Sequence, residues 1–229
     1  MTIYLTGVTN AAIRDYAATE PALGIMVQPR SRLLGQVAAY RHHAADNGVF
    51  GAYQRGVPFD ATAWLRFLDK LPAGGLFAVV PDVVANHQAT RAAWPDYARH
   101  VIDRGHRPAF AIQNGCTDLA QVPDDAAAVF IGGDDAYKLG HQAARVAWQA
   151  RRAGLWVHMG RVNSTRRWLR ALAMGCDSAD GTFLRFGSAA EMIPRLAQWL
   201  AVGRSVGGQL SLLDHLDTPP ERSTDTIPL

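Results

Sequence analysis

Two short segments of the chain combine carboxylate side chains with glycine. The first is Ala-Asp-Asn-Gly-Val-Phe at residues 45–50, and the second is Gly-Cys-Asp-Ser-Ala-Asp-Gly-Thr at residues 175–182. Each adjoins a short apolar run of the kind that forms a buried strand. Two carboxylates brought together from distant parts of a chain can serve as nucleophile and as general acid and base when a glycosidic bond is exchanged. Asp46 and Asp180 are therefore candidate catalytic residues.

The elements that must position these residues recur along the chain. Short apolar runs, often bounded by Gly, Pro or Asp, predict buried parallel strands at residues 3–8, 24–28, 48–52, 76–80, 109–113, 127–131, 155–159 and 181–184. Helical patterns lie between most of them, at residues 33–45, 61–71, 87–104, 137–153, 165–174 and 189–202. This alternation predicts an α/β fold, a compact single-domain (β/α)8 barrel of the TIM type over residues 1–202, with a doubly wound open sheet as the alternative.

Residues 203–229 differ in composition from the rest. They include Gly207-Gly208, Pro219-Pro220 and several Ser and Thr residues. We expect a partly ordered C-terminal tail, which packs as a short helix at residues 210–216 before it frays.

Polar residues and glycines stand near the ends of the predicted strands. In a barrel these positions meet at one rim, where catalytic groups collect. In chain order the set is Asp46, Asp82, Gln113, Gly132, Gly133, His158, Met159, Gly160 and Asp180. One aspartate at a strand–helix junction is more often a helix cap than a catalyst, so the joint pattern carries the hypothesis.

Composition excludes several classes of protein. The chain carries a net charge of +3, with 21 arginines and 2 lysines, which is compatible with a polyanionic partner. Cys116 and Cys176 are its only cysteines, so neither a disulfide framework nor a cysteine-rich zinc site is expected. We expect no metal, since two lone cysteines and dispersed histidines give no ligand cluster. We also expect no cofactor, and a dinucleotide site has no support because no Gly-x-Gly-x-x-Gly follows a strand. No apolar run is long enough to span a bilayer, and the N-terminus does not resemble a signal peptide, which predicts a cytoplasmic protein without a membrane partner.

The order of these motifs resembles that of the queuine and archaeosine tRNA-guanine transglycosylases. Their Asp-Ser-Gly-Gly-Phe-Gln motif is similar to residues 46–50, and their Val-Gln-Gly segment to residues 112–115. Their base-recognising Asp matches Asp82. Their Gly-Gly pair, Met-Gly pair and Asp-x-x-Asp nucleophile segment resemble residues 132–133, 159–160 and 177–180. The resemblance covers roughly residues 24–185 and implies a (β/α)8 barrel.

Three departures separate this chain from the tRNA enzymes. The Cys-x-Cys-x-x-Cys…His zinc subdomain is missing, Thr182-Phe183-Leu184 replaces Pro-Thr-Arg, and the chain is far shorter. Together with His-Met-Gly-Arg-Val-Asn-Ser at residues 158–164, these features resemble the compact phage and bacterial branch that inserts 7-deazaguanines into DNA. In a phage-encoded protein, the compartment would be the host cytoplasm.

The resemblance implies a role for each matching residue. Asp180 is the nucleophile that attacks C1′, and Asp46 moves the proton to and from the exchanged base. Asp82 accepts hydrogen bonds from a guanine-like edge, while Gln113 and the Gly133 N–H donate to O6. Base contacts also come from Gly132, His158, Met159 and Gly160. The implied ligands are a guanine in DNA, flipped out or single-stranded, and a free 7-deazaguanine base, with the 7-cyano form (preQ0) expected first.

Arginines after the seventh predicted strand suggest where phosphates bind. Arg161, Asn163, Arg166, Arg167 and Arg170 form the candidate nucleic-acid-binding set. For the last three, a solvated helix face is an equally good interpretation.

Three other functions remain open from the sequence. One is exchange in tRNA, which the missing zinc subdomain disfavours. Another is a glycosidase or nucleoside hydrolase, which would need no guanine-reading group. The third is a non-catalytic nucleic-acid-binding barrel, disfavoured by the Asp46 and Asp180 pair. The oligomeric state is also open.

Overall fold

The computed structural model describes residues 1–216 and folds as the predicted (β/α)8 barrel. Eight parallel strands pair in chain order, and β8 closes the barrel by pairing with β1. The strands are β1 (Ile3–Thr6), β2 (Leu23–Val27), β3 (His43–Ala45), β4 (Ala78–Val79), β5 (Pro108–Ile112), β6 (Ala128–Ile131), β7 (Trp156–Met159) and β8 (Ser178–Gly181).

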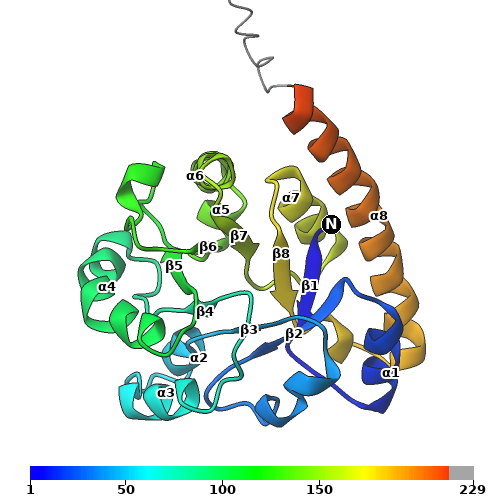
Figure 1. Ribbon diagram of the computed structural model, residues 1–229, viewed down its shortest axis with the longest axis horizontal. Coiled ribbons are helices and arrows are strands. Elements are labelled where there is room, and N and C mark those ends of the chain that lie inside the picture. The colour runs from blue at the N-terminus through cyan, green and yellow to red at the C-terminus, as the bar shows by residue number, and fades with distance from the viewer. Residues whose placement is uncertain (217–229) are drawn as a thin grey trace, which may run out of the picture.

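Helices surround the strands (Figure 1). The α-helices are α1 (Ala11–Thr19), α2 (Val49–Gln54), α3 (Ala61–Leu68), α4 (His87–Ile102), α5 (Asp135–Lys138), α6 (His141–Arg152), α7 (Thr165–Ala173) and α8 (Ala189–Leu216). Short 3-10 helices are η1 (Leu34–Ala39), η2 (Leu119–Gln121) and η3 (Phe183–Arg185). Many of the helices begin at a side chain that accepts a hydrogen bond from the first turn, as Asn86 does from the Ala89 N–H. None of the helices within residues 1–216 is long and apolar enough to cross a bilayer.

The core has two layers, as the alternation of side chains along parallel strands requires. One cluster fills the barrel interior, where small alanines at positions 44, 109, 111 and 128 pack with Phe77. The larger cluster lies between the barrel and the helices. The alanines leave interior space for rings, and Phe130 packs against the same cluster.

The third predicted strand and the first predicted helix were wrong. Residues 33–45 form η1 and then β3, and residues 49–54 form α2. The chain turns where the Asp46 and Asn47 side chains accept the Gly48 and Val49 N–H groups, at 2.9 and 2.8 Å. Gly48 has φ +80°, which favours glycine. Asp46 therefore follows β3 instead of preceding a strand.

The eighth strand lies three residues earlier than predicted. Its sequence, Ser-Ala-Asp-Gly, contains no apolar run. The side chains of Ser178 and Asp180 both contact His158, whereas Ala179 packs in the core between barrel and helices. Residues 183–185, predicted as strand, form η3. Asp180 consequently lies within β8.

The last helix is longer than predicted. Helix α8 runs from Ala189 to Leu216 along the outside of the barrel, beside α1 and α7 (Figure 1). The expected boundary between residues 202 and 203 falls inside this helix. The part of the predicted tail at residues 217–229 lies outside the described residues, so the division into barrel and tail stays a prediction.

Candidate active site

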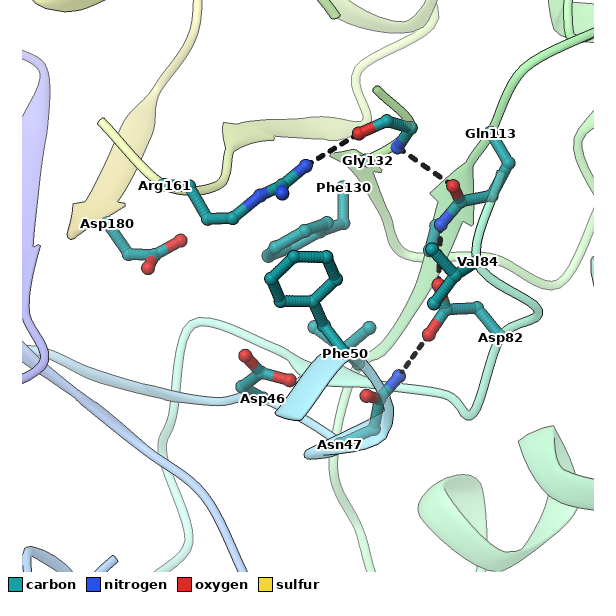
Figure 2. A pocket seen from close by; sticks show the side chains of 13 residues that line it. Asp46, Asn47, Phe50, Asp82, Val84, Gln113, Phe130, Gly132, Arg161 and Asp180 are labelled. Atoms are coloured by element: carbon teal, nitrogen blue, oxygen red, sulfur yellow. Dashed lines mark hydrogen bonds between the residues drawn. The ribbon is translucent and has the colours of Figure 1, made fainter. Parts of the chain in front are cut away.

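A pocket of roughly 520 Å³, open to solvent, lies at the rim formed by the carboxyl ends of the strands (Figure 2). It is lined by Asp46, Asn47, Phe50, Val79, Asp82, Val84, Ala111, Gln113, Phe130, Gly132, Gly133, Arg161 and Asp180. Seven of the predicted site residues thus meet in one place, namely Asp46, Asp82, Gln113, Gly132, Gly133, Arg161 and Asp180. The side chains of three aspartates face this single pocket.

Asp46 is held by the turn that follows β3. Its Oδ1 accepts the Gly48 N–H at 2.9 Å. Burial, together with the negative charges of Asp180 and Asp82, raises the pKa of Asp46 to about 7, against the lowering effect of the backbone N–H groups. A carboxyl group with this pKa can both give and take a proton near neutral pH.

Asp82 is the centre of a hydrogen-bonded network that spans three loops. Its Oδ1 accepts the Asn47 side-chain N–H at 2.8 Å, and its Oδ2 accepts the Gln113 side-chain N–H at 2.5 Å. Burial raises the pKa of Asp82, while these two donors and the Arg161 charge act in the opposite direction. The network fixes both carboxylate oxygens before a ligand binds.

Gln113 holds the opposite wall of the pocket together. Its Oε1 accepts the Ala85 N–H at 3.0 Å and the Gly133 N–H at 2.8 Å. The Gly133 N–H, expected to face a base, is therefore already used by a side chain of the protein. The Gly132 N–H likewise donates to the Ile112 carbonyl, at 3.0 Å.

Asp180 is held by a buried histidine. His158 Nε2 and Asp180 Oδ1 are 2.9 Å apart, and His158 Nδ1 and Ser178 Oγ are 2.8 Å apart. His158 is fully buried, whereas 16% of the Asp180 side chain is exposed to the pocket. His158 thus lies behind the pocket and contacts the carboxylate instead of a ligand.

Two aromatic rings and one guanidinium lie between the carboxylates. Figure 2 shows the rings of Phe50 and Phe130 in the middle of the pocket, with Arg161 beside them. The Arg161 guanidinium carbon lies 4.2 Å from the centre of the Phe50 ring, and its Nη2 donates to the Gly133 carbonyl at 2.6 Å. Arg161 also has φ +62°, a strained value for a residue with a Cβ. The site therefore offers a flat apolar slot with a cation at its edge.

The predicted base contacts at Met159 and Gly160 lie outside the pocket lining. Met159 is fully buried in the core between barrel and helices. Gly160 packs so closely on Phe130 that an added Cβ would come within 2.6 Å of its ring, and within 3.4 Å of Asp180 Oδ1. Both residues therefore lie behind the residues that line the pocket and pack against the surrounding structure.

Lys138 is the residue near the site that sequence reasoning missed. It is fully buried at the end of α5, and its Nζ donates to the Gly160 carbonyl at 2.9 Å. Burial, together with the charge of Arg161, lowers the pKa of Lys138 to about 7, against the raising effect of the Asp180 charge. In the sequence it is a single lysine in a helical pattern, with nothing to mark it as buried.

The remaining predicted phosphate ligands differ in their surroundings. Arg167 pairs with Asp135, at 2.5 Å, and donates to the Arg161 carbonyl at 3.0 Å. Arg170 donates to the Gly140 carbonyl at 3.0 Å. The Asn163 side-chain oxygen accepts the Thr182 N–H at 2.7 Å. Arg166 alone among these residues is exposed.

Exposed aromatic and apolar side chains follow three of the strands along the chain. Tyr53 after β3 is 65% exposed, Val83 after β4 is 40% exposed, and Phe186 after β8 is 65% exposed. Tyr53 stacks on Phe50, with ring centres 6.4 Å apart. Among the side chains that the structure describes, those of residues 1–206, no three His, Cys, Asp or Glu are grouped as a metal site would require. The chemistry available in the pocket is that of carboxylates and an arginine.

Comparison with known proteins gives the fold and no family. No protein-family model and no curated protein matches the chain. A solved structure described as "Native KDPGal structure" has a TM-score of 0.52 and 13% identity, over 90% of this chain and 95% of its own. A cube-shaped, highly porous protein cage designed by fusing symmetric oligomeric domains has a TM-score of 0.52 and 14% identity, over 94% of this chain and 76% of its own. At such identities the similarity shows the barrel alone.

Proposed function

We propose that this protein is a transglycosylase that exchanges guanine in DNA for a 7-deazaguanine base. The observation that carries the proposal is the convergence of Asp46, Asp82 and Asp180 on one pocket, each in a different environment. Base exchange needs three groups of this kind: a nucleophile, a proton carrier and a group that recognises the base. The motif order that resembles the tRNA-guanine transglycosylases supports the same assignment.

The exchange proceeds in two displacements at one carbon. Asp180 attacks C1′ of the target nucleotide, the bond from C1′ to the guanine nitrogen breaks, and Asp46 protonates the departing base. A glycosyl ester with Asp180 results. The incoming base then attacks C1′, its proton passes to Asp46, and the ester bond breaks, which regenerates both carboxyl groups with the configuration retained.

Asp82 is suited to hold the guanine-like edge. Its two oxygens are fixed by Asn47 and Gln113, at 2.8 and 2.5 Å, and retain lone pairs for ring and exocyclic N–H donors. Phe50 and Phe130 supply the flat apolar contact. Gln113 acts chiefly by orienting Asp82 and the Gly133 loop, since its oxygen is already used.

The rim supports a polymeric substrate. Tyr53 and Phe186 can stack on bases next to the target nucleotide, and Arg161 and Arg166 can contact phosphates. We choose DNA over tRNA because the cysteines that a tRNA-docking zinc subdomain requires are missing from the sequence.

The pocket favours a neutral substituent on the incoming base, such as the nitrile of preQ0. Asp134 and Asp135 are the acids nearest Gly133 that could pair with an aminomethyl cation. Asp134 accepts hydrogen bonds from Asn114 and from the Tyr137 N–H, and Asp135 pairs with Arg167. Neither lines the pocket. An exchange assay in which the aminomethyl base outcompetes preQ0 would reject this choice.

The test of the function uses labelled guanine, a guanine-containing DNA oligonucleotide and the matching RNA. We expect the wild-type protein to exchange label in DNA and to form a covalent protein–DNA adduct. Asp180→Asn should form no adduct and lose at least about 10³-fold in rate, because an amide cannot form the glycosyl ester. Asp177→Asn is the matched control, since Asp177 lies three residues before Asp180 and pairs with Arg151 outside the pocket.

Each alternative function predicts a different result. Exchange into RNA alone would show a tRNA transglycosylase. Release of base without incorporation would show a hydrolase. A hydrolase needs no group that recognises guanine, so a loss of activity in Asp82→Ala that is confined to guanine substrates would count against it. Binding of DNA without exchange or adduct would show a non-catalytic subunit.

A further inference from the structure

We infer that a buried chain of hydrogen bonds, from Trp156 through Ser178 and His158 to Asp180, fixes the nucleophile and selects which of its oxygens reacts. The role of Asp180 as nucleophile rests on the proposed function. The hydrogen-bond chain rests on the structure alone. Trp156 Nε1 donates to Ser178 Oγ at 2.8 Å. From there the chain continues to His158 Nδ1 at 2.8 Å and from His158 Nε2 to Asp180 Oδ1 at 2.9 Å.

The position of the His158 ring is fixed by two aromatic neighbours, one stacked and one tilted. Phe77 and Phe130 pack against it with ring centres 4.9 Å away in each case, and His158 itself is fully buried. Ring rotation would break two hydrogen bonds in a region closed to water. His158 is therefore a rigid support for the Asp180 carboxylate. It stacks on Phe130, which lines the pocket, and does not line the pocket itself.

The protons of this chain can be assigned by counting donors and acceptors. The indole of Trp156 is a donor only, so Ser178 Oγ must accept from it. The Ser178 hydroxyl then has one hydrogen to donate, and His158 Nδ1 is the other partner of Ser178 Oγ. With Nδ1 as acceptor, the neutral imidazole carries its hydrogen on Nε2 and donates it to Asp180 Oδ1.

The other protonation states leave a buried hydrogen without a partner. If Nδ1 carried a hydrogen, Ser178 Oγ would accept from both neighbours, and its own hydroxyl hydrogen would have no acceptor among the described side chains of residues 1–206. An unpaired hydroxyl in a region closed to water costs about 1–3 kcal/mol. The same count disfavours an imidazolium, which carries hydrogens on both ring nitrogens.

The assignment has a consequence for the reaction. Asp180 Oδ1 is occupied by His158, whereas Oδ2 has no hydrogen bond within the described part of the chain. Asp180 points toward the pocket (Figure 2). Oδ2 is therefore the atom that attacks C1′, and His158 and Ser178 are positioning residues that never contact the substrate.

The first test reads the tautomer directly and needs no activity. Long-range ¹H–¹⁵N spectra of protein labelled at histidine distinguish the two neutral tautomers and the imidazolium, and the His158 signals are those lost in His158→Gln. We expect the Nε2–H tautomer at neutral pH in the wild type, and loss of that single state in Ser178→Ala. An Nδ1–H tautomer or an imidazolium in the wild type would overturn the inference.

The second test separates hydrogen bonding from packing. His158→Phe retains a ring between Phe77 and Phe130 but donates no hydrogen bond, whereas His158→Gln retains an N–H for Asp180. We expect adduct formation to slow about 10²-fold in His158→Phe and by less than about tenfold in His158→Gln, with the dissociation constant for the oligonucleotide unchanged.

His87→Gln is the matched control. His87 is also a buried histidine that packs on an aromatic ring, Phe110, and neither of its ring nitrogens has a hydrogen-bond partner within residues 1–216. Equal losses in His158→Phe and His158→Gln would show a packing role alone and overturn the inference. If the wild-type protein exchanges no base, the proposed function is rejected. The tautomer measurement then still tests the hydrogen-bond chain, because it needs no activity.

Discussion

Asp46 and Asp180 are chemically the same residue, and their surroundings make them different groups. Burial and two nearby carboxylates raise the pKa of Asp46 to about 7. Asp180 receives a hydrogen bond from an immobile histidine. A group that exchanges protons near neutrality and a carboxyl group held in place by a hydrogen bond suit the two roles in the proposed base exchange.

This difference predicts the pH dependence of the reaction. In the proposed mechanism guanine leaves with a proton from Asp46, so the protonated fraction of Asp46 is expected to set the rate of adduct formation. That fraction falls as the pH rises through the folded-state pKa of about 7. We expect single-turnover rates between about pH 5.5 and about pH 9 to decline above about pH 7, by up to tenfold per unit.

A variant identifies the group responsible for that decline. Lys138 also has a pKa of about 7. Lys138→Met should therefore retain the alkaline decline if Asp46 causes it. A flat profile in Lys138→Met would assign the decline to the lysine instead.

Lys138 also makes folding stability depend on pH. Its pKa is about 7 in the folded protein, against 10.5 in the unfolded chain. Between these values the unfolded state binds a proton that the folded state does not, so stability rises with pH by up to about 1 kcal/mol per unit. Denaturant titrations at several pH values should show this rise in the wild type and a smaller one in Lys138→Met. The only other lysine, Lys70, is exposed, so Lys70→Met should behave as the wild type does.

At the scale of elements, β8 and the loop after β7 are fitted against each other at Gly181. An added Cβ there would come within 2.5 Å of the Val162 carbonyl and 2.7 Å of the Tyr4 hydroxyl, and closer still to Asn163 Oδ1. The Tyr4 hydroxyl donates to the Val162 carbonyl at 3.1 Å, which ties β1 to this loop. Asp180 is the preceding residue, so its position depends on the lack of a side chain at Gly181.

Gly181→Ala should therefore affect both stability and activity. We expect a loss of about 1–3 kcal/mol in the free energy of unfolding, because neither the backbone nor the buried tyrosine can move away. Adduct formation should slow as well, since β8 has to shift. Gly35→Ala is the control, because an added Cβ there meets nothing within 4 Å. Equal stability of the two variants would contradict the prediction, because it would show that the loop after β7 can move to make room for the added Cβ at low cost.

The same elements show what the sequence could predict. Longer apolar strands such as β5 and β6, and the periodic helices α4 and α7, lie within a few residues of the prediction. β3 and β8 were misplaced because they are short and rich in alanine or polar residues, and their pairing partners define them more than their own composition does. The aspartates were found because strand ends converge in a barrel, whereas the His158 contacts and the burial of Lys138 depend on packing across several elements.

At the scale of the whole molecule, an aromatic cluster joins the last helices to the first strand. Trp168 on α7 stacks with Trp199 on α8 at 6.2 Å between ring centres, and its indole N–H donates to the Trp199 carbonyl at 2.7 Å. The Tyr4 ring packs edge-on against both, at 6.1 Å. The cluster therefore fixes α8 against the end of the barrel where β1 and β8 close.

Removing the centre of this cluster should destabilise the entire domain. Trp168 is fully buried, so we expect Trp168→Ala to lower the free energy of unfolding by about 3–5 kcal/mol in denaturant titrations. Trp148→Ala is the matched control, since that residue is 58% exposed on α6 and contacts Arg152. A similar cost for both substitutions would contradict the structural role of the cluster.

The pairing of β8 with β1 has a consequence for the time at which activity arises during synthesis. The residues that pair, such as Leu5 with Asp180, lie at opposite ends of the barrel sequence. A ribosome must release nearly all of the barrel sequence before Asp180 reaches its place in β8, and helix α8 follows later still. Nascent chains that already contain Asp46, Asp82 and Gln113 still lack Gly132, Gly133, Arg161 and Asp180, which complete the lining of the pocket. Under the proposed function, base exchange begins only when the ring of strands is closed.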